Sequence, residues 1–401
     1  MKDRKFWKGF GTGFLTMVTC LLILVLVTMV TGAVDWTFLL PGASGSVVNT
    51  KTERKLKEVQ SYIDMYYLDQ IDDKSMADSL CRGALEGLDD KYAAYYNEKE
   101  YEDMMEKTSG NYCGIGAYVS QNVTTGAITV ISPLEDSPAQ KAGLQAGDVI
   151  YQVDGEDVTG QDLSSVVSKM KGEPGTRVRL TIVRAGKEKP FDISLTRSEI
   201  ESKTVSYKML DDKIGYIAVS AFEEVTKEQF EEALKKLEKQ GQKALIIDLR
   251  DNGGGLLSTA VAMLDRLLPE GVVVYTKDKN GKKHEYFSDN QESFDKAVAI
   301  LVNGNSASAS EVFSGAMQDY EKAVLIGTTT YGKGIVQSVF NLSDGTALKL
   351  TTSKYYTPKG RNIHGTGLEP DEKVELNQET TTLKNGLTVD NQVKAALDYL
   401  K

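Results

Sequence analysis

Two short segments of the sequence carry residue types that a hydrolase could use. The first, Ser306–Glu311, places Ser308 between two alanines, and the second, Tyr331–Gln337, places Lys333 between two glycines. A serine hydroxyl is a weak nucleophile until a base takes its proton. The whole chain contains only 2 histidines, whereas a buried lysine with a lowered pKa can act as the base. The pair therefore indicates a hydrolase with a serine nucleophile and a lysine base.

A glycine-rich segment is expected to lie close to Ser308. Ala244–Leu249 is a continuous apolar run, as in a strand buried on both faces, and Asp248–Gly255 then ends in three glycines. Ser308 also follows a buried strand and begins a helix. Both loops are therefore expected at the carboxyl ends of strands, where α/β sheets place their sites. The N–H of Ala309 would lie at the helix start, which favours an oxyanion.

One segment partly matches a phosphate-binding loop. Gly327–Lys333 fits its first seven positions, but the eighth is Gly334 instead of the serine or threonine that holds magnesium. A helix should follow, whereas Ile335–Phe340 is typical of a strand. We therefore expect no bound nucleotide, and the sequence implies no metal and no other cofactor.

Length and composition indicate a folded protein of two or three domains, with 401 residues, 41% hydrophobic and 26% charged. The formal charge of -10, from 47 basic and 57 acidic side chains, argues against a nucleic-acid partner. The three cysteines, Cys20, Cys81 and Cys113, have no metal-site spacing and form no disulfide framework. Cys81 and Cys113 could pair, but two free thiols are the favoured interpretation.

The amino-terminal segment predicts a membrane anchor. Residues 1–8 are basic, and residues 9–34 carry no charge and exceed the roughly 20 residues that a transmembrane helix needs. The basic end should stay in the cytoplasm, so the chain from Asp35 onward is expected outside the cell membrane. A signal peptide cleaved near Thr31–Ala33 is the alternative.

The rest of the chain divides by composition and periodicity. Apolar residues recur at helical spacing in residues 51–108. This segment is too small to form a large hydrophobic core by itself, so we expect it to pack against another surface, such as a second copy of the chain in a homodimer. Strands and helices alternate from Glu199 onward, which predicts an α/β core with a mainly parallel sheet. The predicted regions are a linker at 35–50, a helical segment at 51–108, a β-rich domain at 109–198 and the α/β core at 199–401.

The β-rich region resembles a PDZ domain, and Ala142–Ile150 is a specific match within it. The resemblance implies that Gly114, Ile115 and Gly116 hold the terminal carboxylate of a peptide on backbone N–H groups. The peptide would then add a strand beside a helix near Leu163–Met170. A small β-rich domain that binds no peptide is the alternative.

Taken together, the motifs resemble the carboxyl-terminal processing, or tail-specific, proteases. The resemblance runs from the helical segment almost to the end of the chain. It implies that Ser308 is the nucleophile, that Lys333, 25 positions later, is its base, and that Gln337 orients the lysine. The oxyanion hole would pair the N–H of Ala309 with that of Gly254. The matching segments are Gly114–Gly116, Ala142–Leu144, Asp248–Asn252, Gly254–Gly255, Ser306–Glu311, Gly332–Gln337 and Gly367–Asp371.

The resemblance implies a membrane-anchored endopeptidase with an α/β protease core, a PDZ domain, a helical amino-terminal segment and one transmembrane helix. It would dock free apolar carboxyl termini of exported proteins and cleave these substrates. The alternative is a catalytically inactive PDZ scaffold that only binds tails. Lys171 stands where the family often has an arginine that couples the PDZ domain to the active site, and lysine lacks the planar fork of arginine. Asp319 matches an acidic family position, for which we expect a structural role.

Overall fold

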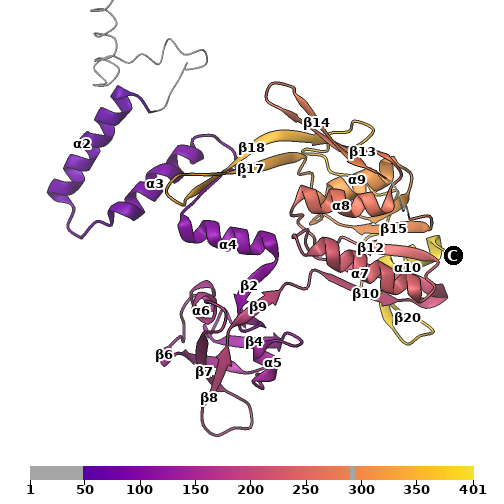
Figure 1. The fold of residues 1–401 in the computed structure, drawn as a ribbon, viewed down its shortest axis with the longest axis horizontal. Helices are drawn as coiled ribbons and strands as arrows, with labels where there is room; N and C mark the ends of the chain where they lie inside the picture. Colours follow the sequence, from indigo (N-terminus) through magenta and orange to yellow (C-terminus); the bar gives the residue numbers. More distant parts are fainter. Residues whose placement is uncertain (1–47, 290–293) are drawn as a thin grey trace, which may run out of the picture. The chain divides into compact units, whose positions relative to one another are not determined.

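The computed structural model describes residues 48–289 and 294–401, and the chain divides into two compact units, residues 1–77 and 78–401 (Figure 1). The predicted basic tail and membrane-spanning helix, residues 1–34, lie outside the described residues, as does most of the predicted linker. Within the described part of the chain, no helix is both long enough and apolar enough to cross a membrane.

The described part of the first unit is helical. It contains α2 (Thr50–Tyr66) and the start of α3 (Asp73–Glu86). The side chain of Asn49 caps α2 by accepting hydrogen bonds from two backbone N–H groups. No residue of α2 is buried, and several of its large apolar side chains are exposed.

The second unit contains an α/β core built on a six-stranded sheet. Its strand order is β10-β11-β12-β15-β16-β19, in which β10 is antiparallel to β11 and every other neighbouring pair is parallel. The mainly parallel sheet is therefore as predicted. The strands are β10 (Val205–Met209), β11 (Ile214–Val219), β12 (Ala244–Asp248), β15 (Ala297–Val302), β16 (Ala323–Gly327) and β19 (Glu372–Lys373).

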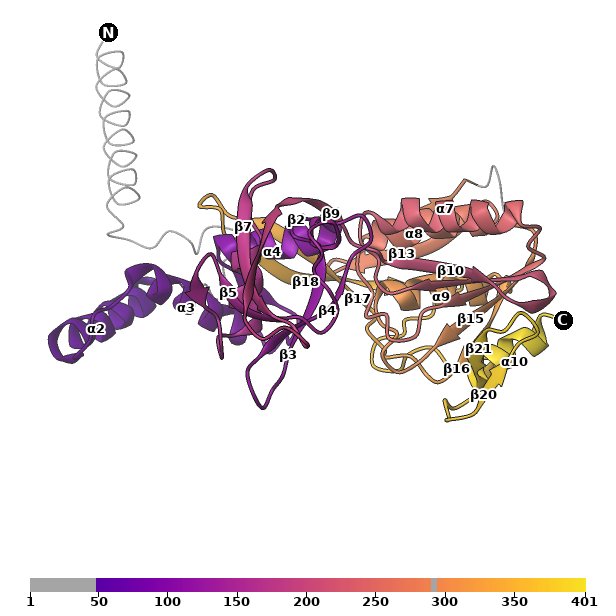
Figure 2. The same cartoon turned by 90° about the horizontal axis from the view of Figure 1, so that it is seen from below.

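Helices cover both faces of this sheet, which explains why its central strands are apolar throughout. Along β12, Leu245 and Ile247 pack into one core with α7, α8 and α9, whereas Ala244 and Ile246 pack into another with α10. Figure 2 shows α7 and α8 on one side and α10 on the other. The helices are α7 (Thr226–Lys239), α8 (Leu257–Leu267), α9 (Ala309–Asp319) and α10 (Asn391–Tyr399). A 3₁₀ turn (Asp211–Lys213) and a hairpin of β20 (Thr380–Thr382) and β21 (Thr388–Asp390) complete this region.

A second sheet brings a distant part of the chain to the core. Its order is β1-β18-β13-β14, and β17 pairs with β18. The short strand β1 (Ala94–Tyr96) lies within the segment predicted to be helical, and it pairs antiparallel with β18, opposite Ala347 to Lys349. The other strands are β13 (Gly271–Asp278), β14 (Lys283–Ser288), β17 (Ile335–Asn341) and β18 (Ala347–Tyr356). The helix α4 (Glu98–Ser109) follows β1.

The β-rich region has a separate hydrophobic core and the arrangement expected for a PDZ domain. In its main sheet, of order β3-β4-β5-β7-β8, the strand β3 lies at an edge, which leaves that edge open to an added peptide strand. The strands are β2 (Asn111–Gly114), β3 (Ala117–Gln121), β4 (Ile128–Pro133), β5 (Val149–Val153), β6 (Glu156–Asp157), β7 (Arg177–Val183), β8 (Phe191–Thr196) and β9 (Ser198–Glu201), and the helices are α5 (Pro138–Lys141) and α6 (Leu163–Met170).

Candidate active site

The structure brings the five residues predicted for catalysis and the oxyanion hole into one cavity of about 640 Å³. They come from three separate segments of the chain: the loop after β12, the start of α9, and the loop that leads into β17 together with β17 itself. The five are Gly254, Ser308, Ala309, Lys333 and Gln337. Apolar side chains complete the walls, and they include Leu256, Leu257, Val312, Ile335 and Val336. Such a lining suits a ligand that presents apolar groups to the cavity.

Ser308 has the backbone geometry of a residue held in a sharp turn between a strand and a helix. It caps the amino terminus of α9 with φ 57 and ψ −114, a conformation that a residue other than glycine rarely adopts and that is enriched at functional sites. The next residue, Ala309, is buried. Within the described residues its N–H donates no hydrogen bond, so this N–H is free to bind an oxyanion at the helix start.

The two neighbouring serines are engaged elsewhere. The hydroxyl of Ser306 donates to the carbonyl oxygen of Leu249 at 2.7 Å, and that of Ser310 donates to the carbonyl oxygen of Asn252 at 2.8 Å. Both serines are fully buried. Their hydroxyls join the loop after β15 to the loop after β12, which leaves Ser308 as the serine of this motif that lines the cavity.

The loop after β12 approaches Ser308 so closely that glycine is required. A Cβ on Gly254 would lie 2.7 Å from the carbonyl oxygen of Ala307 and 3.0 Å from the amide nitrogen of Ala309. The N–H of Gly254 donates to Asn252 Oδ1 at 2.9 Å, and the Asn252 side chain in turn donates to the carbonyl oxygen of Val219. The predicted oxyanion donor Gly254 thus lies beside Ser308 and Ala309, but its N–H is occupied by Asn252.

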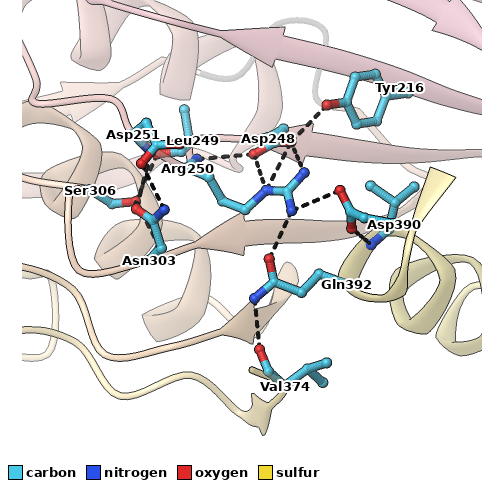
Figure 3. A network of polar contacts seen from close by, with 11 residues as sticks. Tyr216, Asp248, Leu249, Arg250, Asp251, Asn303, Ser306, Val374, Asp390 and Gln392 are labelled. Carbon is cyan, nitrogen blue, oxygen red and sulfur yellow. Dashed lines mark hydrogen bonds and ion pairs between the residues drawn. The ribbon is translucent and has the colours of Figure 1, made fainter. Parts of the chain in front are cut away.

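A buried polar network holds the base of the same loop (Figure 3). Arg250 donates to both oxygens of Asp248 through Nε and Nη2, and its Nη1 pairs with Asp390 and Gln392 next to α10. Tyr216 donates to Asp248 Oδ2 at 2.7 Å. Burial, together with the charge of Asp248, raises the pKa of Tyr216. The network joins β12 to the carboxyl-terminal helix and so fixes where the loop starts.

Glu311 joins the nucleophile loop to the lysine loop. It is fully buried on the first turn of α9, and its Oε2 accepts from the N–H groups of Ser308 at 2.9 Å and Lys333 at 2.8 Å. Its Oε1 accepts from the N–H of Gly332 at 2.7 Å and from the hydroxyl of Thr330 at 2.5 Å. These four bonds compensate the burial of the carboxylate. One side chain therefore sets the backbone spacing of Ser308 and Lys333.

Lys333 is half-buried and has a glutamine as its hydrogen-bond partner. Its Nζ donates to Gln337 Oε1 at 3.0 Å. Burial, followed by the charge of Lys349, lowers the pKa of Lys333 below its ordinary value. A lowered pKa increases the fraction of neutral amine near pH 7, which is the form that can accept a proton from a serine.

Of the predicted peptide-binding residues, Gly114 ends β2 and pairs with Ser198 of β9, whereas Ile115 and Gly116 lie between β2 and β3. The N–H groups of Ile115 and Gly116 find no acceptor within the part of the chain that the structure describes, as a loop that binds a carboxylate would require. Gly116 has φ 74, and a Cβ there would lie 2.4 Å from that of Ser137. Lys171 forms an ion pair with Glu106 of α4.

Asp319, for which a structural role was predicted, pairs with Arg361 and accepts from the N–H of Lys359 outside the cavity.

Sequence reasoning missed two residues that shape the site, Glu311 and Tyr92. Glu311 belongs to the serine motif, but no role was predicted for it from the sequence. A single carboxylate after a run of small residues was a signal that this side chain has buried partners. For the contact of Tyr92 with Gln337, the sequence contained no signal, because 245 positions separate the two residues.

Comparisons with known proteins find two matching family models and several similar proteases. The model of peptidase family S41 matches residues 213–374, and that of the PDZ domain matches residues 129–184. A CtpA-like serine protease of Staphylococcus saprophyticus is 38% identical over 88% of this chain and 73% of its own length. The carboxy-terminal processing protease CtpA of Bacillus subtilis is 34% identical over 90% of this chain and 77% of its own length.

A solved structure supports the same fold. The S41 protease of Bacteroides fragilis superposes with a TM-score of 0.50 at 19% identity, over 78% of this chain and 87% of its own length.

Proposed function

Because the chain belongs to peptidase family S41 and is a carboxy-terminal processing serine protease, we propose that Ser308 and Lys333 are its catalytic pair. The observation that carries this proposal is the shared cavity of Ser308 and Lys333, together with the engagement of the hydroxyls of Ser306 and Ser310 with backbone carbonyls. Of the three serines of this motif, Ser308 is then the one that lines the cavity and can attack a substrate.

The chemistry follows from the positions of these groups. Neutral Lys333 takes the proton of the Ser308 hydroxyl as its oxygen attacks the peptide carbonyl carbon. The N–H of Ala309 stabilises the tetrahedral oxyanion, and the N–H of Gly254 joins it when its bond to Asn252 is released. The lysine ammonium then gives its proton to the leaving amine. Water hydrolyses the acyl-enzyme with Lys333 again acting as base.

The proposed substrates are polypeptides with free apolar carboxyl termini. The edge strand β3 and the unpaired N–H groups of Ile115 and Gly116 support docking of such a tail in the PDZ domain. We further propose that residues 9–34 anchor the chain in the cell membrane, with the protease outside the cytoplasm, so that exported proteins are its substrates. The exposed apolar side chains of α2 support a homodimer, which sedimentation of the full chain would test.

The test of the catalytic pair is covalent labelling. A fluorophosphonate reacts with an activated serine, and mass spectrometry of the labelled full-length chain should locate the adduct on Ser308. Ser308→Ala should lose labelling and peptide cleavage, whereas Ser306→Ala and Ser310→Ala should keep substantial labelling. An adduct on Ser306 or Ser310 with Ser308 unmodified would contradict the assignment, and a folded chain without any adduct would favour the inactive scaffold.

A further inference from the structure

A segment far from the catalytic residues in the sequence contacts both Lys333 and Gln337. Tyr92 lies just before β1, and its carbonyl oxygen accepts a hydrogen bond from Gln337 Nε2 at 2.5 Å. The centre of its ring lies 4.6 Å from Lys333 Nζ. Backbone and side chain of one residue thus touch both partners of the lysine–glutamine pair.

The carbonyl of Tyr92 determines which end of the Gln337 amide faces the lysine. An amide group carries one acceptor oxygen and one donor nitrogen. Since Nε2 donates to Tyr92, Oε1 is left to accept from Lys333 Nζ at 3.0 Å. In the opposite orientation Nε2 would donate to the lone pair of a neutral lysine and oppose its action as a base. The observed orientation keeps that lone pair available for the proton of Ser308.

The ring of Tyr92 lies against the lysine nitrogen. Burial is the largest cause of the lowered pKa of Lys333, and we expect the ring to supply part of that burial by keeping water away from Nζ. The charges of Lys349 and Lys91 act in the same direction, whereas those of Asp90 and Tyr331 oppose it. A ring face also attracts an ammonium group, which would raise the lysine pKa. If burial by the ring dominates, removal of the ring raises the pKa of Lys333; if the attraction dominates, removal lowers it.

The Tyr92 backbone is held in place from both sides. Its N–H donates to Asp90 Oδ1 at 3.0 Å, and β1, which begins two residues later, pairs with β18 from Ala94 onward. On the neighbouring residue, Lys91 Nζ lies 3.4 Å from the hydroxyl of Tyr331, in the loop that precedes Lys333. The carbonyl is therefore a fixed acceptor that Gln337 can use without ordering a mobile loop.

We propose that Tyr92 is a positioning residue for the base, which orients Gln337 through its carbonyl and shields Lys333 through its ring. The proposal rests on the proposed role of Lys333. Tyr92 lies outside residues 213–374, which the protease family model matches, so the proposal adds a residue from another part of the chain to the active site.

The experiment measures the rate of fluorophosphonate labelling of the full chain at pH values between 5 and 10. The rate plotted against pH should rise as Lys333 loses its proton, and the midpoint of this rising limb reports the pKa of the base. For Tyr92→Ala the rising limb should move to higher pH, and the rate at pH 7 should fall by about tenfold or more. Tyr92→Phe keeps the ring and should rescue the limb. Tyr92→Leu keeps part of the cover and should give a smaller shift in the same direction, so the test does not depend on the folding of Tyr92→Ala. The control is Tyr399→Ala, which changes a tyrosine that is 57% exposed.

A double-mutant cycle tests whether the ring of Tyr92 and the amide of Gln337 act on the same lysine. Tyr92→Ala keeps the carbonyl and removes the ring, and it should cost less labelling in a Gln337→Ala background than in the wild type, because both side chains serve proton transfer at Lys333. An unmoved rising limb, a shift to lower pH or fully additive losses would each overturn the proposal for Tyr92. Failure of the wild type to label at Ser308 would instead overturn the proposed function, so the two failures are distinguishable.

Discussion

At the scale of the residue, the proposed catalytic pair depends on the protonation state of Lys333. Burial lowers its pKa, so the neutral base accumulates as the pH rises through that value and is lost as the pH falls. We expect kcat/KM to increase with pH along a single-proton curve with a midpoint below that of an exposed lysine. Initial-rate assays with a fluorogenic peptide at a series of pH values would measure this curve.

Lys333→Arg provides the matched control for the charge. Arginine keeps the positive charge but does not lose its proton in a protein, so the variant should fold, bind peptide and lose cleavage at every pH tested. If Lys333→Arg turned over substrate at close to the wild-type rate, Lys333 would not be the general base.

Gln337 suits a lysine base because it is neutral. Its Oε1 accepts from Lys333 without a charge that would hold the ammonium form. We expect Gln337→Glu to raise the lysine pKa, because an opposite charge within hydrogen-bond distance favours the protonated form. The rising limb of kcat/KM should move to higher pH, and the loss at pH 7 should be partly recovered near pH 9. A loss that is equal at all pH values would argue for a steric role.

At the scale of the element, two loops must keep a fixed spacing. Neighbouring parallel strands β12 and β15 end side by side, and the hydroxyls of Ser306 and Ser310 join the loops that follow them. The lysine loop follows β16, which is parallel to β15, but Lys333 lies several residues beyond the end of that strand. Glu311 supplies the connection, because it binds the N–H groups of both Ser308 and Lys333.

Glu311→Gln should therefore reduce both stability and activity. One amide nitrogen would replace a carboxylate oxygen and meet N–H donors, and loss of hydrogen bonds to a buried charge costs about 2–3 kcal/mol. Thermal unfolding of the full chain would measure the loss, with Glu228→Gln on the exposed surface of α7 as a control that should stay within about 0.5 kcal/mol. A melting temperature equal to that of the wild type would mean that Glu311 does not hold the two loops.

At the scale of the whole molecule, the PDZ domain and the protease core should act on one substrate chain. A peptide with a free apolar carboxyl terminus places a negative charge on the N–H groups of Ile115 and Gly116. Amidation removes that charge, so we expect roughly tenfold or more slower cleavage of the amidated peptide.

Binding should change in parallel with cleavage. Fluorescence anisotropy with the Ser308→Ala chain would separate binding from chemistry, and an acetylated amino terminus on the same peptide serves as the control. Equal cleavage rates for the free-acid and amidated peptides would remove tail recognition from the proposal.

The sequence by itself determined the protease family and the class of fold, and it predicted the catalytic pair. The apolar run of β12 predicted a sheet buried on both faces, because an alternating pattern was absent. The spacing of Ser308 from a strand end and a helix start predicted an oxyanion site, because free N–H groups at a helix amino terminus are a local property. These features depend on neighbours in the sequence, so a reader of the sequence can find them.

Only the tertiary structure decided how the base is held and which N–H groups are free. Gly254 was predicted as an oxyanion donor, but its N–H is bound by Asn252, and the backbone conformation of a glycine loop is set by its packing against Ala307 and Ala309. Tyr92 reaches Gln337 because β1 pairs with β18. Pairing between strands so far apart in the sequence follows from the packing of the whole core, which no local pattern encodes.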